Sequence, residues 1–284
     1  MIENDLPLFT RNDWLTAALG EKCREVTFNW EGQPCTFSFQ YHRSKGRLWA
    51  QTPDFVPFTS ISGLEKTATL ELGLDFIEEF RDALPKHAVF HFRFPLGWTF
   101  EAQVHERYTV RERLTHCLAA GSDLNTSMKS TLKRNLKKAE KAFEVGNSIS
   151  FEALWMLVEE VFKRQNMKPH YGKSRMQRTF NSARELGGQR IYTALKDGEV
   201  VAVLWVLFDQ NFSYNFMSGA KEEVRSFQPN TLLLHRAISE AFQNQQSFDF
   251  FGSSIPSIQR YVRSWGAEPV SYFAVEAKPK LFFI

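Results

Sequence analysis

Cysteine and long apolar runs are both scarce in this chain of 284 residues. The three cysteines are an odd number, and no two have the Cys-x-x-Cys spacing, which argues against a disulfide framework and against a zinc site. The longest apolar run, VVAVLWVLF at 200–208, is too short to cross a bilayer, and the N-terminus MIENDLPLF has acids where a signal peptide needs cations. These absences predict a cytoplasmic protein whose contact with a membrane, if there is one, is peripheral.

The excess of positive charge is also small. The chain has 35 Lys and Arg and 32 Asp and Glu, which gives a formal net charge of +3. A charge of this size does not by itself indicate a nucleic-acid partner. Its distribution is uneven, because residues 129–141 hold six cations and one acid. That segment therefore carries +5, and the rest of the chain is net negative.

Apolar residues in and around this basic segment recur at helical spacing, at 128, 132, 136, 139 and 143. The pattern predicts an amphipathic helix with Thr126 or Ser127 as its N-cap. Two interpretations stay open: the cations form a solvated helix face, or they neutralise the phosphates of a nucleic acid. The candidate nucleic-acid-binding residues are Lys133, Arg134, Lys137, Lys138 and Lys141.

Aromatic residues are abundant, with 27 Phe, and most are expected in a core. The length favours two domains or one large domain. In the first half, the patterns predict a hairpin at 24–29 and 34–41, a strand at 47–50, a helix at 66–83 and strands at 88–94 and 105–110.

The second half predicts two helices, a meander of three strands, and then helix, strand, helix and strand. Asp197-Gly198, a preferred hairpin dipeptide, joins the first two strands of the meander. A β-α-β crossover from 212 to 251 requires parallel neighbours, whereas the meander is antiparallel, so the sheet is mixed and mostly antiparallel. The expected fold class is α+β (mixed α/β), with an N-terminal unit at 1–125, a basic connecting helix at 126–146 and a C-terminal unit at 147–284.

This element order resembles the GNAT acyltransferase fold. The segments LKRNLKKAEKAF, VFKRQN, NTLLLHRAI, FDFFGSSIPSIQRYVRSWGA and HERYTV are similar to those of FemABX-type peptidyltransferases. The resemblance implies two GNAT-like units, the first of them reduced. It also implies transfer of an aminoacyl group from aminoacyl-tRNA to an amine of a peptidoglycan precursor.

The chain departs from this family in three places. It has no room for the long helical hairpin of FemA-like members, and Phe251 stands where many similar sequences carry an acid. The glycine-rich pyrophosphate loop of acetyl-CoA enzymes is replaced by SFQPN before the helix at 230. The missing glycines argue against acyl-CoA as the donor, and the missing acid removes one candidate carboxylate.

Asp249 is the remaining candidate catalytic residue. It alternates with Phe248 and Phe250 near the end of a predicted strand, where it should open into a cleft and orient or deprotonate an attacking amine. A structural aspartate that stabilises a turn is the alternative. No G-x-S-x-G elbow surrounds Ser253 and no acid cluster accompanies the histidines, so neither a serine nucleophile nor a metal site is expected.

Two groups of residues are candidates for substrate binding. Gly252, Ser253, Ser254 and Arg260 surround a predicted helix N-terminus, which favours negative charge, although helix capping and a solvated face explain them as well. Arg164, Gln165 and Tyr171 close a helix and begin a loop, where they could hold a peptide or a carbohydrate.

Three functions are compatible with these residues and motifs. The first is a FemABX-like aminoacyltransferase with no bound cofactor, whose partners are aminoacyl-tRNA and an amine substrate. The second is an acyl-CoA-dependent N-acyltransferase of the GNAT class. The third is a non-catalytic binding protein descended from this family.

Overall fold

A computed structural model of the chain describes residue 9 and residues 12–44, 46–59, 61–64, 70–169, 171–252 and 255–277. These residues form two compact units. The N-terminal unit holds the described residues of Phe9–Leu114 and Val270–Ile284, and the C-terminal unit holds those of Thr115–Pro269. This division differs from the predicted one, because the basic helix lies within the C-terminal unit and the last strand completes the N-terminal unit.

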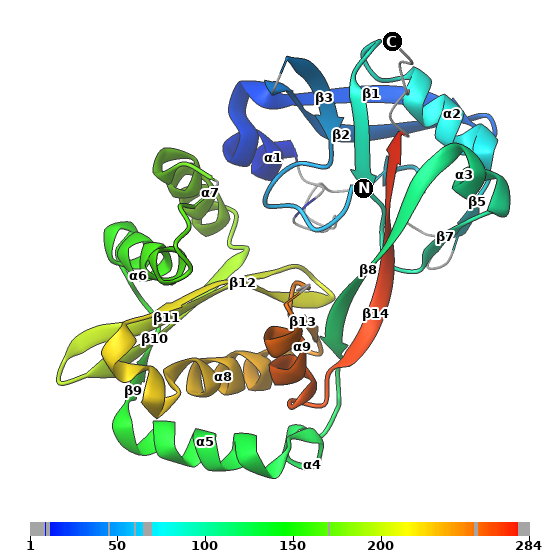
Figure 1. Cartoon of the computed structure of the whole chain (residues 1–284). Helices are drawn as coiled ribbons and strands as arrows, with labels where there is room; N and C mark the ends of the chain where they lie inside the picture. The colour runs from blue at the N-terminus through cyan, green and yellow to red at the C-terminus, as the bar shows by residue number, and fades with distance from the viewer. Residues whose placement is uncertain are drawn as a thin grey trace. The chain divides into compact units, whose positions relative to one another are not determined.

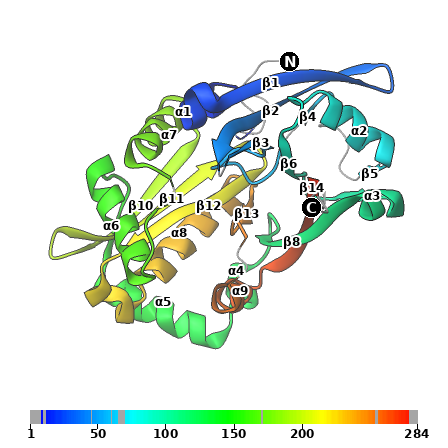
Figure 2. The ribbon, with the colours of Figure 1, turned by 45° about the horizontal axis from the view of Figure 1, so that its top comes forward.

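The N-terminal unit is built on the β1–β2 hairpin, whose long strands lie beside helix α2 (Figure 2). Its strand order is β1-β2-β3-β6-β14, with β4 on β2, and β5 and β7 form a separate parallel pair. The elements are α1 (Asn12–Leu19), the 3-10 turn η3 (Gly20–Lys22), β1 (Cys23–Trp30), β2 (Gln33–Ser44), β3 (Arg47–Gln51), β4 (Ile61–Ser62), β5 (Leu70–Leu72), α2 (Leu74–Asp82), β6 (Val89–Arg93), β7 (Trp98–Phe100) and α3 (Ala102–Arg107). The chain passes between the units within β8 (Tyr108–Leu118) and β14 (Glu268–Ala277).

Phenylalanine rings fill the core of the N-terminal unit. Phe37, Phe76, Phe80 and Phe92 are each at most 2% exposed, and the rings of Phe37 and Phe80 stack with centroids 4.0 Å apart. Large rings bury much apolar surface per residue, and aromatic pairs add a further stabilisation. The abundance of phenylalanine is therefore explained largely by this core.

The C-terminal unit has the strand order β8-β13-β12-β11-β10-β9. Helices α5 and α8 lie side by side on one face of this sheet, and α6 packs on the other face with α7 beside it (Figure 1). The elements are α4 (Leu124–Ser127), α5 (Ser130–Ala142), β9 (Glu144–Gly146), α6 (Phe151–Arg164), α7 (Lys173–Glu185), β10 (Gln189–Lys196), β11 (Glu199–Phe208), β12 (Phe212–Ala220), the 3-10 turn η4 (Glu222–Phe227), α8 (Pro229–Gln243), β13 (Ser247–Asp249) and α9 (Pro256–Arg263).

The expected fold class is confirmed. The sheets are mixed and mostly antiparallel, and β12 and β13 are parallel neighbours joined through α8. Asp197 and Gly198 both have positive φ, at 52° and 80°, as a two-residue hairpin turn between β10 and β11 requires. Among the described segments, none of the helices combines the length and the apolar character that crossing a membrane requires.

Three local predictions were wrong. Leu70–Leu72 is a strand rather than part of a helix, and α2 begins only at Leu74, while 65–69 lie outside the described residues. Residues of the predicted strand at 105–110 begin as helix α3, because the apolar Val104 is fully buried on a short helical turn. Neither Thr126 nor Ser127 caps α5, since both belong to α4, which Asp123 caps.

Candidate functional site

The parallel strands β12 and β13 separate soon after they pair. Their register covers only three positions and ends where Tyr214 lies opposite Asp249, whereas β12 continues to Ala220. The pairing of β12 with β11 also shifts by one residue at Phe216, which is a β-bulge. Within the described residues, 215–220 therefore have a paired strand on one side only. On the other side of β12, the backbone groups of this stretch are not paired with a strand.

Asp249 lies at the point of separation, but its side chain is buried, with 3% of the residue exposed. Its carboxylate accepts hydrogen bonds from the Thr115 hydroxyl and, at 2.7 Å, from the Phe251 N–H. Burial raises the pKa of Asp249 from its usual 3.8 to about 6, and both hydrogen bonds oppose this rise. The expectation that this carboxylate opens into a cleft was wrong. The geometry is that of a turn-stabilising aspartate, and direct catalysis stays a prediction.

The turn that Asp249 holds has an unusual backbone. Phe251 and Gly252 both have left-handed φ values, of 64° and 65°. Glycine adopts this conformation freely, whereas a phenylalanine there needs support from its surroundings. The Phe251 ring has that support in Tyr214 and Phe216 of β12, with centroids 6.3 and 5.7 Å away. An aromatic ring thus packs beside the β-bulge.

Of the rest of the first predicted substrate-binding group, only Arg260 is among the described residues. Ser253 and Ser254 lie outside the described residues, and the N-cap position of α9 is Ile255. Arg260 is exposed on α9. Its neighbour Arg263 instead donates from Nε to Nε2 of the buried His116, at 3.3 Å.

His116 was not found by sequence reasoning, because no local pattern marks it. Burial lowers the pKa of its imidazole, and the cation of Arg263 lowers it further. The neutral ring can therefore accept the hydrogen bond from Arg263. The pair fixes one end of α9 against β8. No signal in the sequence indicates this pair, because predicting it requires knowing that β8 lies beside α9.

The second predicted group meets at the C-terminal half of β12. Arg164 donates to the backbone oxygen of Ala220 at 2.8 Å and lies 3.4 Å from a carboxylate oxygen of Glu222. Tyr171 is buried, with its hydroxyl 3.8 Å from the sulfur of Met217. Gln165 is exposed at the C-cap of α6. Arg164 and Tyr171 thus hold the end of β12, and whether they also contact substrate stays a prediction.

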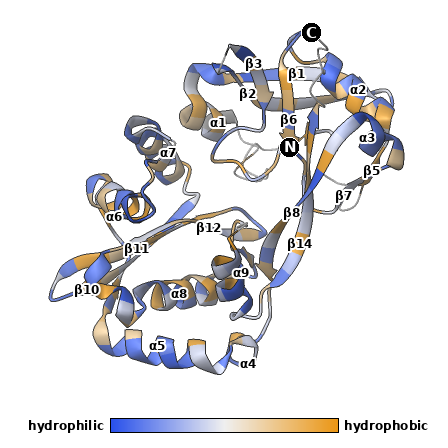
Figure 3. Cartoon of the chain, viewed as in Figure 1, coloured by the Kyte–Doolittle hydropathy of each residue, from blue (hydrophilic) through white to orange (hydrophobic). Residues whose placement is uncertain are grey.

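The basic helix α5 buries its apolar stripe and exposes its cations, and its outer face is strongly hydrophilic (Figure 3). Lys138 donates to the backbone oxygen of Ser226 at 2.8 Å and lies 5.0 Å above the Phe227 ring. No ion pair within the described residues involves the other four candidate cations, Lys133, Arg134, Lys137 and Lys141. Uncompensated charge on one face is what binding of a polyanion requires.

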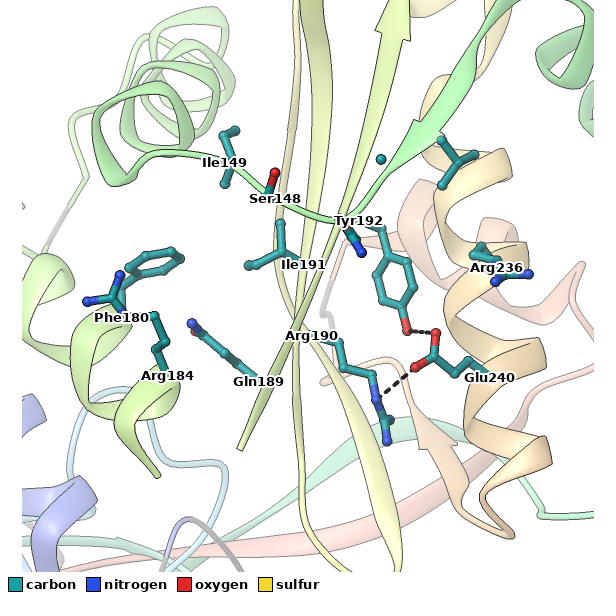
Figure 4. Close-up of a pocket in the computed structure, with 13 residues that line it drawn as sticks. Ser148, Ile149, Phe180, Arg184, Gln189, Arg190, Ile191, Tyr192, Arg236 and Glu240 are labelled. Carbon is teal, nitrogen blue, oxygen red and sulfur yellow. Dashed lines mark hydrogen bonds and ion pairs between the residues drawn. The ribbon is translucent and has the colours of Figure 1, made fainter. Parts of the chain in front are cut away.

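A cavity of about 890 Å³ lies beside β10, near the β9 end of the sheet of the C-terminal unit (Figure 4). Its wall includes an ordered network, in which Glu240 accepts from the Tyr192 hydroxyl at 3.0 Å and from Arg190 Nε at 3.1 Å. Sequence reasoning missed this cavity, because its residues come from distant segments of the chain. Among the described residues, no cluster of three or more His, Cys, Asp or Glu side chains could hold a metal ion.

Residues 126–261 match the model of a protein family described as the acetyltransferase (GNAT) domain. This segment is a GNAT-type domain. It contains the basic helix, the separating pair β12 and β13, and most of α9. No curated protein matches the sequence significantly.

Several solved structures share the fold of the whole chain. FemX has a TM-score of 0.65 at 11% identity, and the match covers 94% of this chain and 91% of FemX. The C-terminal domain of a candidate lysylphosphatidylglycerol synthetase from Agrobacterium fabrum has a TM-score of 0.61 at 9% identity, covering 94% and 87%. L-PGS from Bacillus licheniformis has a TM-score of 0.56 at 12% identity, covering 95% and 88%. At these identities the likeness establishes a shared fold, and the GNAT-type domain has an acyltransferase fold.

Proposed function

We propose that this protein is an acyltransferase that moves an aminoacyl group from aminoacyl-tRNA to an amine of a peptidoglycan precursor or a similar peptide. The observation that carries the proposal is the separation of β12 from β13 within the GNAT-type domain, which leaves backbone groups beside the bulge at Phe216 without a paired strand on that side. The fold shared with FemX and L-PGS supports aminoacyl transfer over other acyl transfers.

The proposed reaction needs no covalent enzyme intermediate. The amine nitrogen attacks the ester carbonyl carbon, a C–N bond forms, and the ester C–O bond to the tRNA breaks. The tRNA leaves with a free hydroxyl after taking up a proton, and the nitrogen, which is positively charged after its attack, loses one. The tetrahedral oxyanion needs hydrogen-bond donors aimed at it, and backbone N–H groups of β12 beyond its pairing with β13 are suited to that role.

Two features of the GNAT-type domain favour aminoacyl-tRNA as the donor: the N-terminus of α8 and the cations of α5. Gln228, with φ of 63°, occupies the N-cap of α8, where a CoA enzyme would use a glycine-rich loop. A side chain at this position crowds the approach of a pyrophosphate to the helix N-terminus. The exposed cations of α5 lie in the same domain and suit the phosphates of a tRNA. Aminoacyl-tRNA is therefore preferred to acyl-CoA.

Asp249 acts in this proposal as a positioning residue. Its carboxylate fixes the Phe251–Gly252 turn and joins it to Thr115 of β8, so it sets the shape of the region between β12 and β13. The proton of the attacking amine then passes to solvent or to a substrate group.

A second function is favoured by one observation. Among the described residues, no exposed carboxylate lies where β12 and β13 separate. Asp249 is buried there, and the Phe251 ring packs against Tyr214 and Phe216. A protein that only binds a cell-wall precursor or a nucleic acid would tolerate this arrangement.

Mass spectrometry distinguishes the two functions. The protein is incubated with mixed aminoacyl-tRNAs and nucleotide-linked muropeptides, and the peptides are examined for an added amino-acid residue. Deacylated tRNA and acetyl-CoA serve as matched donor controls. An added residue only with charged tRNA supports the proposal. Binding of either substrate without any product supports the second function, and an added acetyl group would restore acyl-CoA as the donor.

The role of α5 is tested by charge reversal. Changing Lys133, Arg134 and Lys137 to Glu should weaken filter binding of aminoacyl-tRNA at least 10-fold and reduce its salt dependence, because fewer counterions are released. The control has the same change of charge at the scattered cations Lys22, Arg107 and Lys163. Equal losses in both variants would mean that α5 is not a specific tRNA contact.

A further inference from the structure

Strand β10 has an open edge beside the cavity of Figure 4. It pairs with β11 along its whole length, but β9 covers only Thr193, Ala194 and Leu195. No strand of the described chain pairs with the outer side of the stretch from Gln189 to Tyr192. An edge of this kind is a template for adding an extended segment.

The backbone alternation shows which groups point outward. The Phe208 N–H donates to the Gly188 oxygen at 3.0 Å, so this opposed pair is a hydrogen-bonded one. Such pairs alternate along an antiparallel ladder. Arg190 therefore directs its backbone groups toward β11, and Gln189 and Ile191 direct theirs to the open edge. Thr193, the next outward residue, is opposite Gly146 of β9.

The cavity beside this edge has room for a short extended peptide. Its volume is about 890 Å³, and its walls come from α7, α8 and the segment at 146–149 that leaves β9. Gln189 Oε1 lies in this wall, is buried, and has no hydrogen-bond partner within the described residues. A buried acceptor without a partner costs free energy, which a donor on a bound peptide would recover.

The charge of the cavity favours an acidic ligand. Arg190 is already neutralised by Glu240 and is further fixed by Gln246, at 3.1 Å, so it is part of the wall. Arg184 on α7 and Arg236 on α8 also line the cavity, and neither forms an ion pair within the described residues. Two uncompensated guanidinium groups beside an open strand edge are complementary to carboxylates on an extended chain.

We propose that this edge binds an acidic peptide segment of a partner protein in extended conformation, as an added strand along Gln189–Ile191. The main chain of the peptide bonds to the outward groups of β10, and its carboxylates pair with Arg184 and Arg236. The site lies two strands away from β12 in the sheet order, and the proposal does not rest on the proposed transfer reaction.

The test uses fluorescence anisotropy with a labelled peptide in which two adjacent glutamates are flanked by valines, because adjacent side chains of a strand point to opposite faces, where Arg184 and Arg236 lie. The same peptide with lysine in place of glutamate should bind at least 10-fold more weakly, because its charge repels the two arginines. A peptide with alternate N-methylated amides should also bind at least 10-fold more weakly, because it lacks the donors on one edge. Equal binding of all three peptides, or no binding of the acidic one, would overturn the proposal.

Two kinds of variant locate the site. Ile191→Pro removes an outward N–H without removing a hydrogen bond to β11, and proline is tolerated at such positions of edge strands. It should reduce binding of the acidic peptide at least 10-fold, as should Arg184→Glu combined with Arg236→Glu. Lys22→Glu combined with Arg24→Glu, an equal change of charge in the N-terminal unit, should leave binding unchanged.

Hydrogen exchange provides a readout that does not depend on the proline variant. Bound peptide should protect the outward-pointing amides of β10 at least 10-fold and leave that of Arg190 unchanged. Sedimentation tests a second copy of the chain as the occupant. A concentration-dependent dimer that Ile191→Pro abolishes would overturn the acidic-peptide assignment, as would protection confined to other strands.

Discussion

Replacing Asp249 by asparagine should alter the pH dependence of stability in a way that can be worked out from its surroundings. Burial raises the pKa of this carboxyl from 3.8 to about 6. One pKa unit corresponds to about 1.4 kcal/mol, so the ionised form is about 3 kcal/mol less favourable in the folded protein than in the unfolded chain. Asparagine keeps the shape and the acceptor oxygen but cannot ionise.

The sign of the effect follows from proton binding. Between pH 3.8 and about 6 the folded state holds more protons at Asp249 than the unfolded state, so this residue makes the protein less stable as the pH rises. About half of the penalty is present at pH 5, and nearly all of it at pH 8. The stability of Asp249→Asn relative to the natural protein should therefore increase by about 1.4 kcal/mol between these two pH values.

Urea denaturation at pH 5, 6, 7 and 8, followed by circular dichroism, measures this difference. The buried amide N–H₂ of the asparagine adds a destabilisation of about 1–3 kcal/mol at every pH, so the change with pH is the informative quantity. Asp82→Asn, at an exposed position, controls for the substitution itself. A difference between Asp249→Asn and the natural protein that stays constant from pH 5 to 8 would refute the reasoning.

Of three further predictions, two concern packing and one concerns the pKa of His116. Phe80→Ala should destabilise the N-terminal unit by about 3–5 kcal/mol in scanning calorimetry, because its ring is fully buried; a loss under about 1 kcal/mol would contradict this. Gly219→Ala should cost about 1–3 kcal/mol, since a Cβ there would lie 2.5 Å from the α6 backbone, whereas Gly172→Ala meets nothing within 4 Å and should be nearly silent. Arg263→Gln should raise the pKa of His116 toward its usual value, because a neighbouring cation is removed, as NMR titration of the imidazole would show; an unchanged pKa would mean that burial alone lowers it.

Elements with strong local signals were predictable from the sequence. Asp197 and Gly198 indicate a hairpin by themselves, and the structure gives both a positive φ. The parallel neighbours β12 and β13 followed from the crossover through α8. The amphipathic spacing of α5 correctly separated its buried stripe from its cations. In each case the information lies within a short stretch of chain.

The candidate site was harder to predict, because it depends on contacts between distant segments. Alternation correctly places Asp249 and Phe248 on opposite faces of β13, but it cannot show that Thr115 and the Phe251 turn enclose the carboxylate. The bond between His116 and Arg263 joins residues 147 positions apart. The compact units differ from the predicted domains for the same reason, since the return of the last strand to the N-terminal unit has no local signature.

That return constrains the order in which the chain can fold as it is made. Strand β14 pairs with β6, and Val275 is fully buried among the phenylalanine rings of the N-terminal unit. The N-terminal unit therefore lacks one strand of its sheet until residues 268–277 have been translated. The C-terminal unit, whose strands all lie within one continuous stretch of the chain, can complete its sheet earlier, so the protein is expected to mature in the reverse of its order of synthesis.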